Sequence, residues 1–534
     1  MEQSKQKATI FNNVMGPVGI GPSTSNTCGP CRVAYLSAKL CRGPLKEAEI
    51  VFPAEGGYSS PNGKGMRSDY AFAHGLLGRL PDAGAPLLDA FDDLKAAGVE
   101  LRFTVDPALE AGGEHLLSLL RLTDAGGETT VVRGLSKGGG IIELTQIDDL
   151  PVSIGGERHL LLVFTEAAAA AGLTEALRSA WPELADYESA CSVAGGRALI
   201  QIPMREPFAP EKLGQVRSMD AVRRACVLPA ILPVVVVPRP EPPFETADEL
   251  SGYCERTGAS LTEAAVAYER SVSGWSEERI RGYARSVLEA MRDAVRHGLE
   301  PGLRFDGIVE PSAARMLGGL EGGTVIDDGI VSRAAVYSLA VMEYSNASGV
   351  VVCMPTAGAS GTVAGALLAA AERLGSTDRE LVDALLAAGA VGVSISEDND
   401  FCGGVYGCQA EVGCASGMAA AALAVLRGGT ARQAMDAASM ALQNMLGLIC
   451  DPVCGLVQVP CFSRNMSAVA NAVVCANAAL LGYPGTIPLQ DAFEAMKSSG
   501  ASMPAELKGG GGGLCRTRQG RCLLERYTAG RGGT

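Results

Sequence analysis

The chain has 534 residues, too many for a single hydrophobic core, so we expect several domains with a large buried interior. Its 45 basic and 59 acidic residues give a net charge of −14, and it has no Lys/Arg-rich run, which argues against a nucleic-acid partner. Apolar residues make up 47% of the chain, but the longest apolar stretches, such as Ala419 to Leu426, are shorter than the roughly 20 residues of a membrane-spanning helix.

The N-terminal segment MEQSKQKATIFNNV lacks the basic, apolar and small-residue order of a secretory signal. The sequence therefore predicts a cytoplasmic protein without a membrane partner. In the reducing cytosol, its sixteen cysteines are expected to be free thiols or metal ligands rather than disulfides. For any single cysteine, a buried packing role is the ordinary expectation.

Residues 1–155 have the mixed helix and strand pattern of an α/β domain. A Gly/Ser/Thr-rich loop from Gly16 to Gly29 leads into a predicted helix at Arg32 to Leu40. Further along, Val99 to Val105 alternates in the manner of a strand.

Residues 156–235 predict a small α+β domain. The apolar run LLLVF near His159 is followed by the helical pattern GLTEALRSAW, a turn at Gly195 and Gly196, and the strand-like RALIQI. This βαββ pattern resembles an ACT-like regulatory domain. The segment that follows, residues 236–246, is rich in proline and predicts an extended linker.

Residues 247–534 predict an all-helical bundle. Ala-rich segments such as STDRELVDALLAAGA and GMAAAALAVLRGG repeat apolar residues at helical spacing, and Gly-containing loops between them are natural places for a functional site. The predicted fold class is thus multidomain, with an N-terminal α/β domain, a small ACT-like α+β domain and a C-terminal all-α catalytic bundle.

Three cysteines of this bundle lie in loop-like motifs: Cys408 in GCQAEVG, Cys450 in LGLICDPVCG and Cys461 in LVQVPC. Cys461 follows a proline and Cys450 precedes one by two residues, where a helix is interrupted and a thiolate can face a cavity. On chemistry alone, metal ligands and buried packing thiols are equally good interpretations. The CxxC pair Cys28 and Cys31 lies in the other half and lacks the second pair of a typical zinc site.

Longer motifs around these cysteines carry a specific resemblance. NASGVVVCMPTAGASG, CQAEVGCASGMAAA and LGLICDPVCGLVQVPC, followed by Arg464 and Asn465, look like the catalytic domain of the iron-sulfur-dependent L-serine dehydratases. The resemblance implies a [4Fe-4S] cluster, no pyridoxal phosphate and a homodimer. Three thiolates would leave one iron of the cluster without a protein ligand, free to act as a Lewis acid. The cluster ligands that the resemblance implies are Cys408, Cys450 and Cys461.

The N-terminal loop GPSTSNTCGPCR is similar to the family's substrate loop GPSSSHTxGPxR. Hydroxyls and backbone donors in such a loop suit a carboxylate, although a simple Gly/Ser turn before a helix is the structural alternative. TAGASG would line the site from the helical half, and Glu411 is either a partner of the site or a satisfied polar residue. The substrate-binding residues implied are Ser23, Ser25, Thr27, Thr356, Ala357 and Gly358.

Three histidines of the family pattern are missing: the chain has Asn26 in the substrate loop, Met66 in GKGMRSD and Asn444 in LQNMLGL. Each change removes an imidazole that exchanges protons near neutral pH. The candidate catalytic residues are therefore Lys64, as a base whose pKa burial would depress, with Ser25 and Asn26.

These features favour a lyase that removes the α-proton and the β-substituent of L-serine or a related amino acid, leaving an enamine that hydrolyses to a 2-oxo acid and ammonia. A cysteine desulfidase and a threonine dehydratase-like lyase are alternatives, distinguished by sulfide or 2-oxobutanoate in place of pyruvate. A non-catalytic sensor of amino acids or oxygen is the alternative outside the enzymes.

The C-terminal segment KGGGGGLCRTRQGRC resembles the family's terminal GGL segment, whose last cysteine folds back onto the open iron. Cys515 and Cys522 are the possible tail ligands here, although neither is the final residue. The glycine run is also compatible with a flexible tail.

Overall fold

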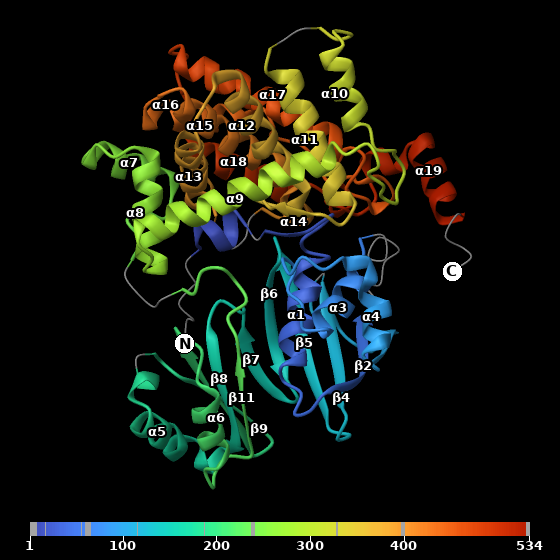
Figure 1. Cartoon of the computed structure of the whole chain (residues 1–534), viewed down its shortest axis with the longest axis vertical. Coiled ribbons are helices and arrows are strands. Elements are labelled where there is room, and N and C mark those ends of the chain that lie inside the picture. Colours follow the sequence, from blue (N-terminus) through green and yellow to red (C-terminus); the bar gives the residue numbers. More distant parts are fainter. Residues whose placement is uncertain are drawn as a thin grey trace. The chain divides into compact units, whose positions relative to one another are not determined.

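The computed structural model describes residues 8–16, 18–54, 56–58, 66–114, 116–185, 187–236, 241–326, 329–396 and 401–529 (Figure 1). The chain forms two compact units. The helical unit comprises Met1–Thr24 and Arg239–Thr534, and the α/β unit comprises Ser25–Pro238. The α/β unit contains both strands and helices, whereas the other unit is largely helical, so the predicted multidomain fold class is confirmed.

The α/β unit contains a six-stranded sheet with helices on one face (Figure 1). Its elements are β2 (Leu45–Pro53), β3 (Glu100–Asp106), β4 (Leu117–Asp124), β5 (Thr129–Gly138), β6 (Ile141–Ile147), β7 (Leu150–Ile154), α1 (Cys28–Ala38), α3 (Ser68–Leu76) and α4 (Ala90–Ala96). The strand order is β3-β2-β4-β5-β6-β7, and only β2 and β3 run parallel. Leu36, Phe72 and Leu94 of the helices are buried in one core with Ile50 and Leu120 of the sheet.

A second sheet in the same unit has βαββαβ connectivity. Its elements are β8 (His159–Glu166), α5 (Ala170–Ala180), β9 (Ala190–Ala194), β10 (Arg197–Met204), α6 (Pro210–Arg217) and β11 (Arg224–Leu228). The order β11-β8-β10-β9 is antiparallel throughout. β8 is a continuous apolar run because both of its faces are buried: Leu161 and Val163 belong to one core with α5, and Leu162 belongs to the core of the six-stranded sheet.

The helical unit is built around helices rich in small residues. Its helices are α7 (Ala247–Thr257), α8 (Leu261–Ser273), α9 (Glu277–Gly298), α10 (Ala313–Glu321), α11 (Val331–Asn346), α12 (Ser360–Leu374), α13 (Asp378–Ser394), α14 (Gly403–Tyr406), α15 (Cys414–Leu426), α16 (Ala431–Gln443), α17 (Cys461–Leu480), α18 (Leu489–Ser502) and α19 (Arg518–Ala529). The segment Gln409–Leu426, which includes α15, is long and apolar enough to span a membrane. Since 83% of it is buried inside the structure, it is a core helix of the bundle.

An N-terminal arm packs with the helical unit. It consists of a π-helix, η1 (Ile10–Val14), and a short strand, β1 (Val18–Ile20), which pairs antiparallel with β12 (Val350–Val352). Two glycines of α13 make room for this arm, because a Cβ on Gly389 would lie 2.6 Å from Ile10 and one on Gly392 would collide with Val14. The arm is therefore part of the bundle core.

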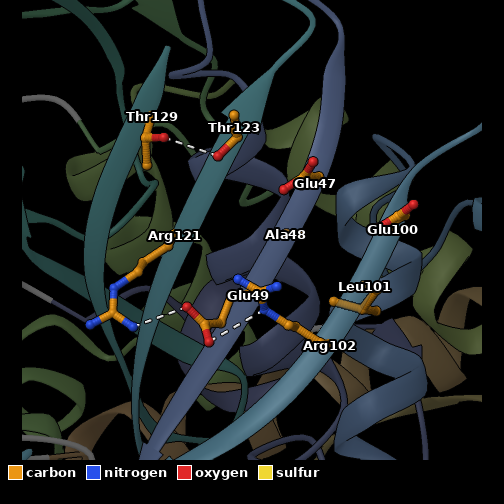
Figure 2. Close-up of a pocket in the computed structure, with 9 residues that line it drawn as sticks. All are labelled: Glu47, Ala48, Glu49, Glu100, Leu101, Arg102, Arg121, Thr123 and Thr129. Carbon is orange, nitrogen blue, oxygen red and sulfur yellow. Dashed lines mark hydrogen bonds and ion pairs between the residues drawn. The ribbon is translucent and has the colours of Figure 1, made fainter. Parts of the chain in front are cut away.

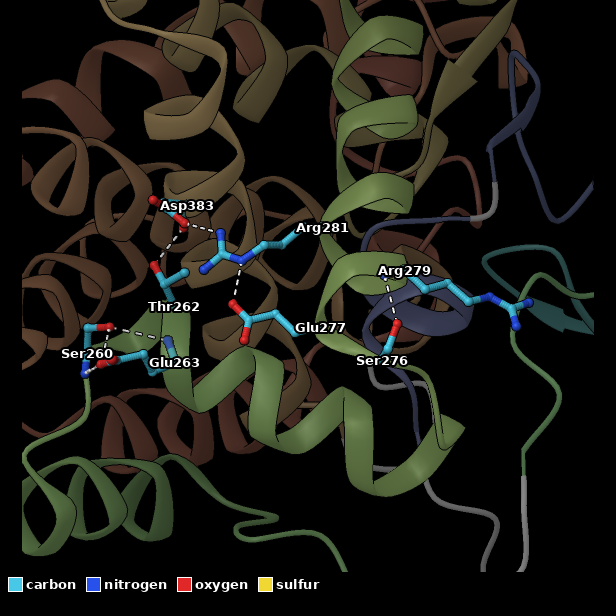
Figure 3. A network of polar contacts seen from close by, with 8 residues as sticks. All are labelled: Ser260, Thr262, Glu263, Ser276, Glu277, Arg279, Arg281 and Asp383. Carbon is cyan, nitrogen blue, oxygen red and sulfur yellow. Dashed lines mark hydrogen bonds and ion pairs between the residues drawn. The ribbon is translucent and has the colours of Figure 1, made fainter.

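Polar contacts fix the outer helices α8 and α9 on α13 (Figure 3). The Arg281 guanidinium donates to Glu277 Oε1 at 2.7 Å and to Asp383 Oδ1 at 2.5 Å, and Thr262 Oγ1 donates to the Asp383 carbonyl at 2.8 Å. Ser260 closes the N-terminus of α8 in a capping box with Glu263. This network joins helix ends and serves the fold.

Candidate functional site

Three thiols from separate loops converge in the helical unit, and we call Cys408, Cys450 and Cys461 the thiol site. Cys408 follows α14, Cys450 lies in the loop after α16, and Cys461 begins α17. The sulfurs of Cys408 and Cys450 and a carboxylate oxygen of Glu411 lie within 4.8 Å of one another. A hydrogen bond with Cys408 and burial raise the pKa of the Cys450 thiol, and burial with the charge of Cys408 raises the pKa of Cys461.

The carboxylate of Glu411 is held between two loops. It belongs to a π-helix, η6 (Gln409–Gly413), and its Oε1 accepts a hydrogen bond from Thr356 Oγ1 at 2.8 Å. Glycine is needed on both sides, because a Cβ on Gly358 would lie 3.0 Å from Oε1 and one on Gly403 would collide with Oε2. Burial raises the pKa of Glu411, and the contacts with Thr356 and Arg464 oppose that shift.

Arg464 brings a positive charge to the thiol site. Its guanidinium is within hydrogen-bonding reach of the Cys408 sulfur, and it also donates to the Ile449 carbonyl at 2.8 Å and to Asp451 Oδ1 at 2.9 Å. Sequence reasoning noted Arg464 only as part of a motif and did not single out Asp451. The signal for Asp451 was its place directly after Cys450 in the CDPV motif.

The C-terminal segment is tied to the loop that carries Cys450. The Cys450 amide donates to the Leu507 carbonyl at 2.8 Å, the Gly509 amide donates to the Cys450 carbonyl at 2.7 Å, and the Leu514 amide donates to Asp451 Oδ2 at 2.8 Å. The glycine run is thus an ordered part of the site.

The two candidate tail thiols have different surroundings. Cys515 Sγ lies 3.3 Å from the Pro452 carbonyl and 3.6 Å from the Asp451 carbonyl. Cys522 lies on α19 and is partly buried. In the described part of the chain, neither sulfur joins the group formed by Cys408, Glu411 and Cys450.

The residues expected to bind substrate fall in both units. Ser23 belongs to the helical unit, whereas Ser25, Asn26 and Thr27 belong to the α/β unit, where Thr27 directly precedes α1. The Ser25 carbonyl accepts from Ser136 Oγ at 2.9 Å.

In the helical unit, the TAGASG loop is bound to α17. Ala357 begins the short helix η5 (Ala357–Ala359), and the Gly358 carbonyl accepts from Asn465 Nδ2 at 2.8 Å. Together with the Thr356 contact to Glu411, this fixes all three residues predicted from that loop beside the CQAEVG segment. Lys64, the candidate base, lies outside the described residues.

The positions of the missing histidines differ in their surroundings. Asn26 Oδ1 accepts from Ser68 Oγ at 3.2 Å, and Met66 lies just before α3. Asn444 Nδ2 donates to Asn471 Oδ1 on α17 at 2.7 Å. The amide at Asn444 is thus engaged with α17 rather than with a thiol-site residue among those described.

A cavity of about 290 Å³ lies on the six-stranded sheet of the α/β unit (Figure 2). Figure 2 shows the Glu49 carboxylate between two guanidiniums, with Arg121 at 3.0 Å and Arg102 at 3.4 Å. The hydrogen bond from Arg121 is the main reason that the pKa of Glu49 is lowered. The lining of this cavity is polar, with Glu49 paired to both arginines, and no cysteine or histidine is among the described residues that line it.

Comparison with known proteins agrees with the motifs. The family model for the serine dehydratase alpha chain matches residues 255–514. A probable L-serine dehydratase alpha chain of Bacillus subtilis (strain 168) is 35% identical over 288 residues, which cover 54% of this chain and 96% of that protein. The L-serine dehydratase alpha chain of Peptoniphilus asaccharolyticus is 34% identical, covering 52% and 96%. The chain belongs to the L-serine dehydratase family.

The L-serine dehydratase family relationship extends beyond the helical unit. L-serine dehydratase 2 of Escherichia coli (strain K12) is 28% identical over 504 residues, which cover 92% of this chain and 95% of that protein. This member of the L-serine dehydratase family therefore carries both units in one chain, and it is an enzyme of the L-serine ammonia-lyase type.

Proposed function

We propose that this chain is a [4Fe-4S]-dependent lyase that eliminates the β-substituent of L-serine or a closely related amino acid, giving a 2-oxo acid and ammonia. The observation that carries the proposal is that the Cys408 and Cys450 sulfurs lie within 4.8 Å of each other beside one arginine, with Cys461 close enough for Cys408 to raise its pKa. A buried cysteine that only fills space behaves as a small apolar residue, so packing alone does not explain why these thiols lie together beside a guanidinium.

The residues present fit an iron-sulfur cluster. Cysteine thiolates are the ligands of such clusters, and the donor set here contains three of them within one side-chain group. The raised pKa values of Cys450 and Cys461 mean that without metal these two thiols retain their protons, so loading of iron would release protons. A cluster bound by these three residues supplies a Lewis-acidic iron that assists departure of the β-hydroxyl group.

The chain's own residues would orient the substrate and move its protons. Thr356 and Glu411 form a fixed hydrogen-bonded pair beside the thiols, and the Arg464 guanidinium is within hydrogen-bonding reach of the Cys408 sulfur. The resemblance assigns carboxylate binding to the hydroxyl-rich loop of Ser23, Ser25 and Thr27, and we retain that assignment as part of the proposal. The proposed catalytic residues are Lys64, as the base for the α-proton, with Ser25 and Asn26.

The proposed substrates are L-serine and its β-substituted relatives rather than L-serine alone. The reason is that Asn26, Met66 and Asn444 replace the three histidines of the family pattern. A changed set of proton carriers favours a changed substrate, so L-threonine and L-cysteine belong in the same proposal. The proposal also includes a homodimer and a regulatory role for the βαββαβ part of the α/β unit as an ACT-like domain.

The test is anaerobic purification and reconstitution, followed by iron and sulfide analysis and assays with L-serine, L-threonine and L-cysteine. Four irons and four sulfides per chain, with pyruvate, 2-oxobutanoate or sulfide formed, is the expected result. Replacement of Cys461 by Ser should abolish both cluster and turnover, while Cys226→Ala, a change in the α/β unit, serves as the control. A chain that binds no iron, or one that is active without it, would contradict the proposal.

A further inference from the structure

We propose that the Glu411 carboxylate is a fourth protein ligand of the cluster, binding the iron that the three cysteines leave free when no substrate is present. This inference rests on the proposed function, since it requires that the thiol site holds a cluster. It assigns to Glu411 the position that the C-terminal thiol of related sequences was expected to fill.

The first argument is the position of the carboxylate. A Glu411 carboxylate oxygen and the Cys408 and Cys450 sulfurs all lie within 4.8 Å of one another. The charge of Glu411 also contributes to the raised pKa of Cys461, whose sulfur lies outside the group formed by Cys408, Glu411 and Cys450 in the described structure. Four donors with these chemistries in one place are what a cluster with four protein ligands requires.

The second argument is the orientation of the two carboxylate oxygens. Oε1 accepts the hydrogen bond from Thr356, which fixes the side chain. Oε2 lies beside Gly403. A Cβ atom added to Gly403 would collide with Oε2 and would lie 3.5 Å from Cys450 Sγ, so Oε2 and this sulfur flank the same point. Among the described residues, Thr356 provides the hydrogen bond to this carboxylate, and it leaves Oε2 on the side of the thiols. Carboxylate oxygens are ordinary ligands of iron in proteins.

The third argument is the placement of the tail thiols. Cys515 Sγ is directed to the carbonyl oxygens of Asp451 and Pro452, and the hydrogen bond from Leu514 to Asp451 holds that segment in place. Cys522 lies on α19, which packs through Leu523 and Tyr527 against the short helix Val453–Gly455. In the described structure, the Cys515 sulfur is therefore engaged with the Asp451 and Pro452 carbonyls and neither tail sulfur joins the group with Cys408 and Cys450, whereas Glu411 does.

A carboxylate ligand has a functional consequence. An incoming amino acid offers oxygen ligands of the same hard type, so exchange of one carboxylate for another at the iron changes neither its oxidation state nor the net number of thiolates. Thr356 would keep the displaced Glu411 side chain close to its position. The iron would thus be protected in the resting enzyme without a thiolate having to leave.

The experiment uses the reconstituted holoprotein of the full chain. Protein is produced with glutamate labelled with ¹³C at the side-chain carboxyl, the cluster is reduced with dithionite, and electron-nuclear double resonance is recorded without substrate. A ¹³C hyperfine coupling to the cluster is expected in wild type and should be lost in Glu411→Gln. The matched controls Cys515→Ser and Cys522→Ser should retain it.

The outcomes separate this inference from the proposed function. A wild-type protein with four irons but no ¹³C coupling overturns the Glu411 ligand and leaves the cluster assignment intact. Loss of the coupling in Cys515→Ser or Cys522→Ser, with retention in Glu411→Gln, overturns it in favour of another ligand. Because the decisive measurement is made on wild type, it does not depend on whether Glu411→Gln folds. Absence of iron in every protein overturns the proposed function itself.

Discussion

Asp451 Oδ2 accepts a hydrogen bond from the Leu514 backbone amide at 2.8 Å, which connects the C-terminal segment to the loop that carries Cys450. The other oxygen of this buried carboxylate pairs with Arg464 at 2.9 Å, and Arg464 reaches the Cys408 sulfur. A change in the C-terminal segment is therefore transmitted to the thiol site through two charged side chains.

Substitution of Gly513 by Ala should detach this segment. Gly513 has a φ of +55°, and a Cβ there would collide with Asp451 Oδ2, so strain and steric overlap add. We expect a loss of about 1–3 kcal/mol in unfolding free energy and faster bleaching of the cluster by oxygen. Denaturant unfolding and the decay of visible absorbance in air measure the two effects.

The matched control is Gly511→Ala. Gly511 also has a positive φ, of +78°, but a Cβ there would have no atom within 4 Å. Only the backbone strain is then introduced, and the bleaching rate should stay close to that of wild type. Equal bleaching in both variants would show that the Asp451 contact has no influence on the site.

Truncation after Lys508 removes the segment altogether. The Gly509 amide that donates to the Cys450 carbonyl and the Leu514 amide that donates to Asp451 are both lost, while the three cysteines remain. We expect faster oxidative bleaching, and a lower apparent KM if the segment competes with substrate. Steady-state kinetics under anaerobic conditions and absorbance decay test this. If both values match wild type, the tail is a spectator.

Single replacement of Cys408, Cys450 or Cys461 by Ser should abolish the broad visible absorbance of the anaerobically reconstituted protein, because in the proposed site each thiolate would hold one iron. Iron analysis gives the second measurement. Cys41→Ser and Cys226→Ala, which lie in the α/β unit, should keep the full complement. Full iron retention in all three thiol-site variants would remove the assignment of these residues as ligands.

Turnover of L-serine should be weak despite an intact cluster, because the imidazoles expected at Asn26, Met66 and Asn444 are absent. A kcat/KM for L-serine of roughly 10⁴ M⁻¹s⁻¹ or more, the range of efficient enzymes, would disprove this prediction. Asn26→His alone need not restore activity, because a base must be oriented as well as present, and Asn26 is bonded to Ser68 here.

Glu269 should make the helical unit less stable as the pH rises. It is fully buried, its Oε2 accepts from the Ile10 amide at 2.7 Å, and burial raises its pKa from 4.5 to about 8. The folded state therefore holds a proton that the unfolded state releases between these values. The contribution of Glu269 to the free energy of unfolding is therefore fully present below pH 4.5. It decreases by at most about 1.4 kcal/mol per pH unit as the pH rises, and it is lost above pH 8.

Unfolding free energies of wild type and Glu269→Gln between pH 5 and 8.5 test this directly. The difference between the two proteins should change with pH, with Glu269→Gln gaining relative stability toward pH 8. The exposed Glu278→Gln should run parallel to wild type. A pH-independent difference for Glu269→Gln would mean that the buried carboxyl does not titrate in this range.

The sequence was informative where chemistry is local. The motifs around Cys408, Cys450 and Cys461 singled out these thiols, and in the structure Cys408 and Cys450 lie together, with Cys461 near enough for Cys408 to influence its pKa. The apolar run LLLVF, the first part of the predicted βαββ pattern, lies in strand β8, where continuous apolar residues match burial on both faces.

What the sequence missed depends on contacts between distant segments. The glycine run before Leu514 was compatible with flexibility, but Gly509, Gly511 and Gly513 have positive φ angles in an ordered turn against the Cys450 loop. Likewise, the first 24 residues were assigned with the α/β domain, whereas their partners are α13 and β12 of the helical unit. Local pattern contains no information on such pairings.

The N-terminal arm has a consequence for biosynthesis. Ile10 and Val14 pack against Gly389 and Gly392, so these residues leave the ribosome long before the other half of their core is made. The α/β unit, Ser25–Pro238, has its own cores and all its strands by the time residue 238 emerges. The arm must wait with its apolar side chains exposed until α13 is synthesised, which makes this stretch a natural client for a chaperone.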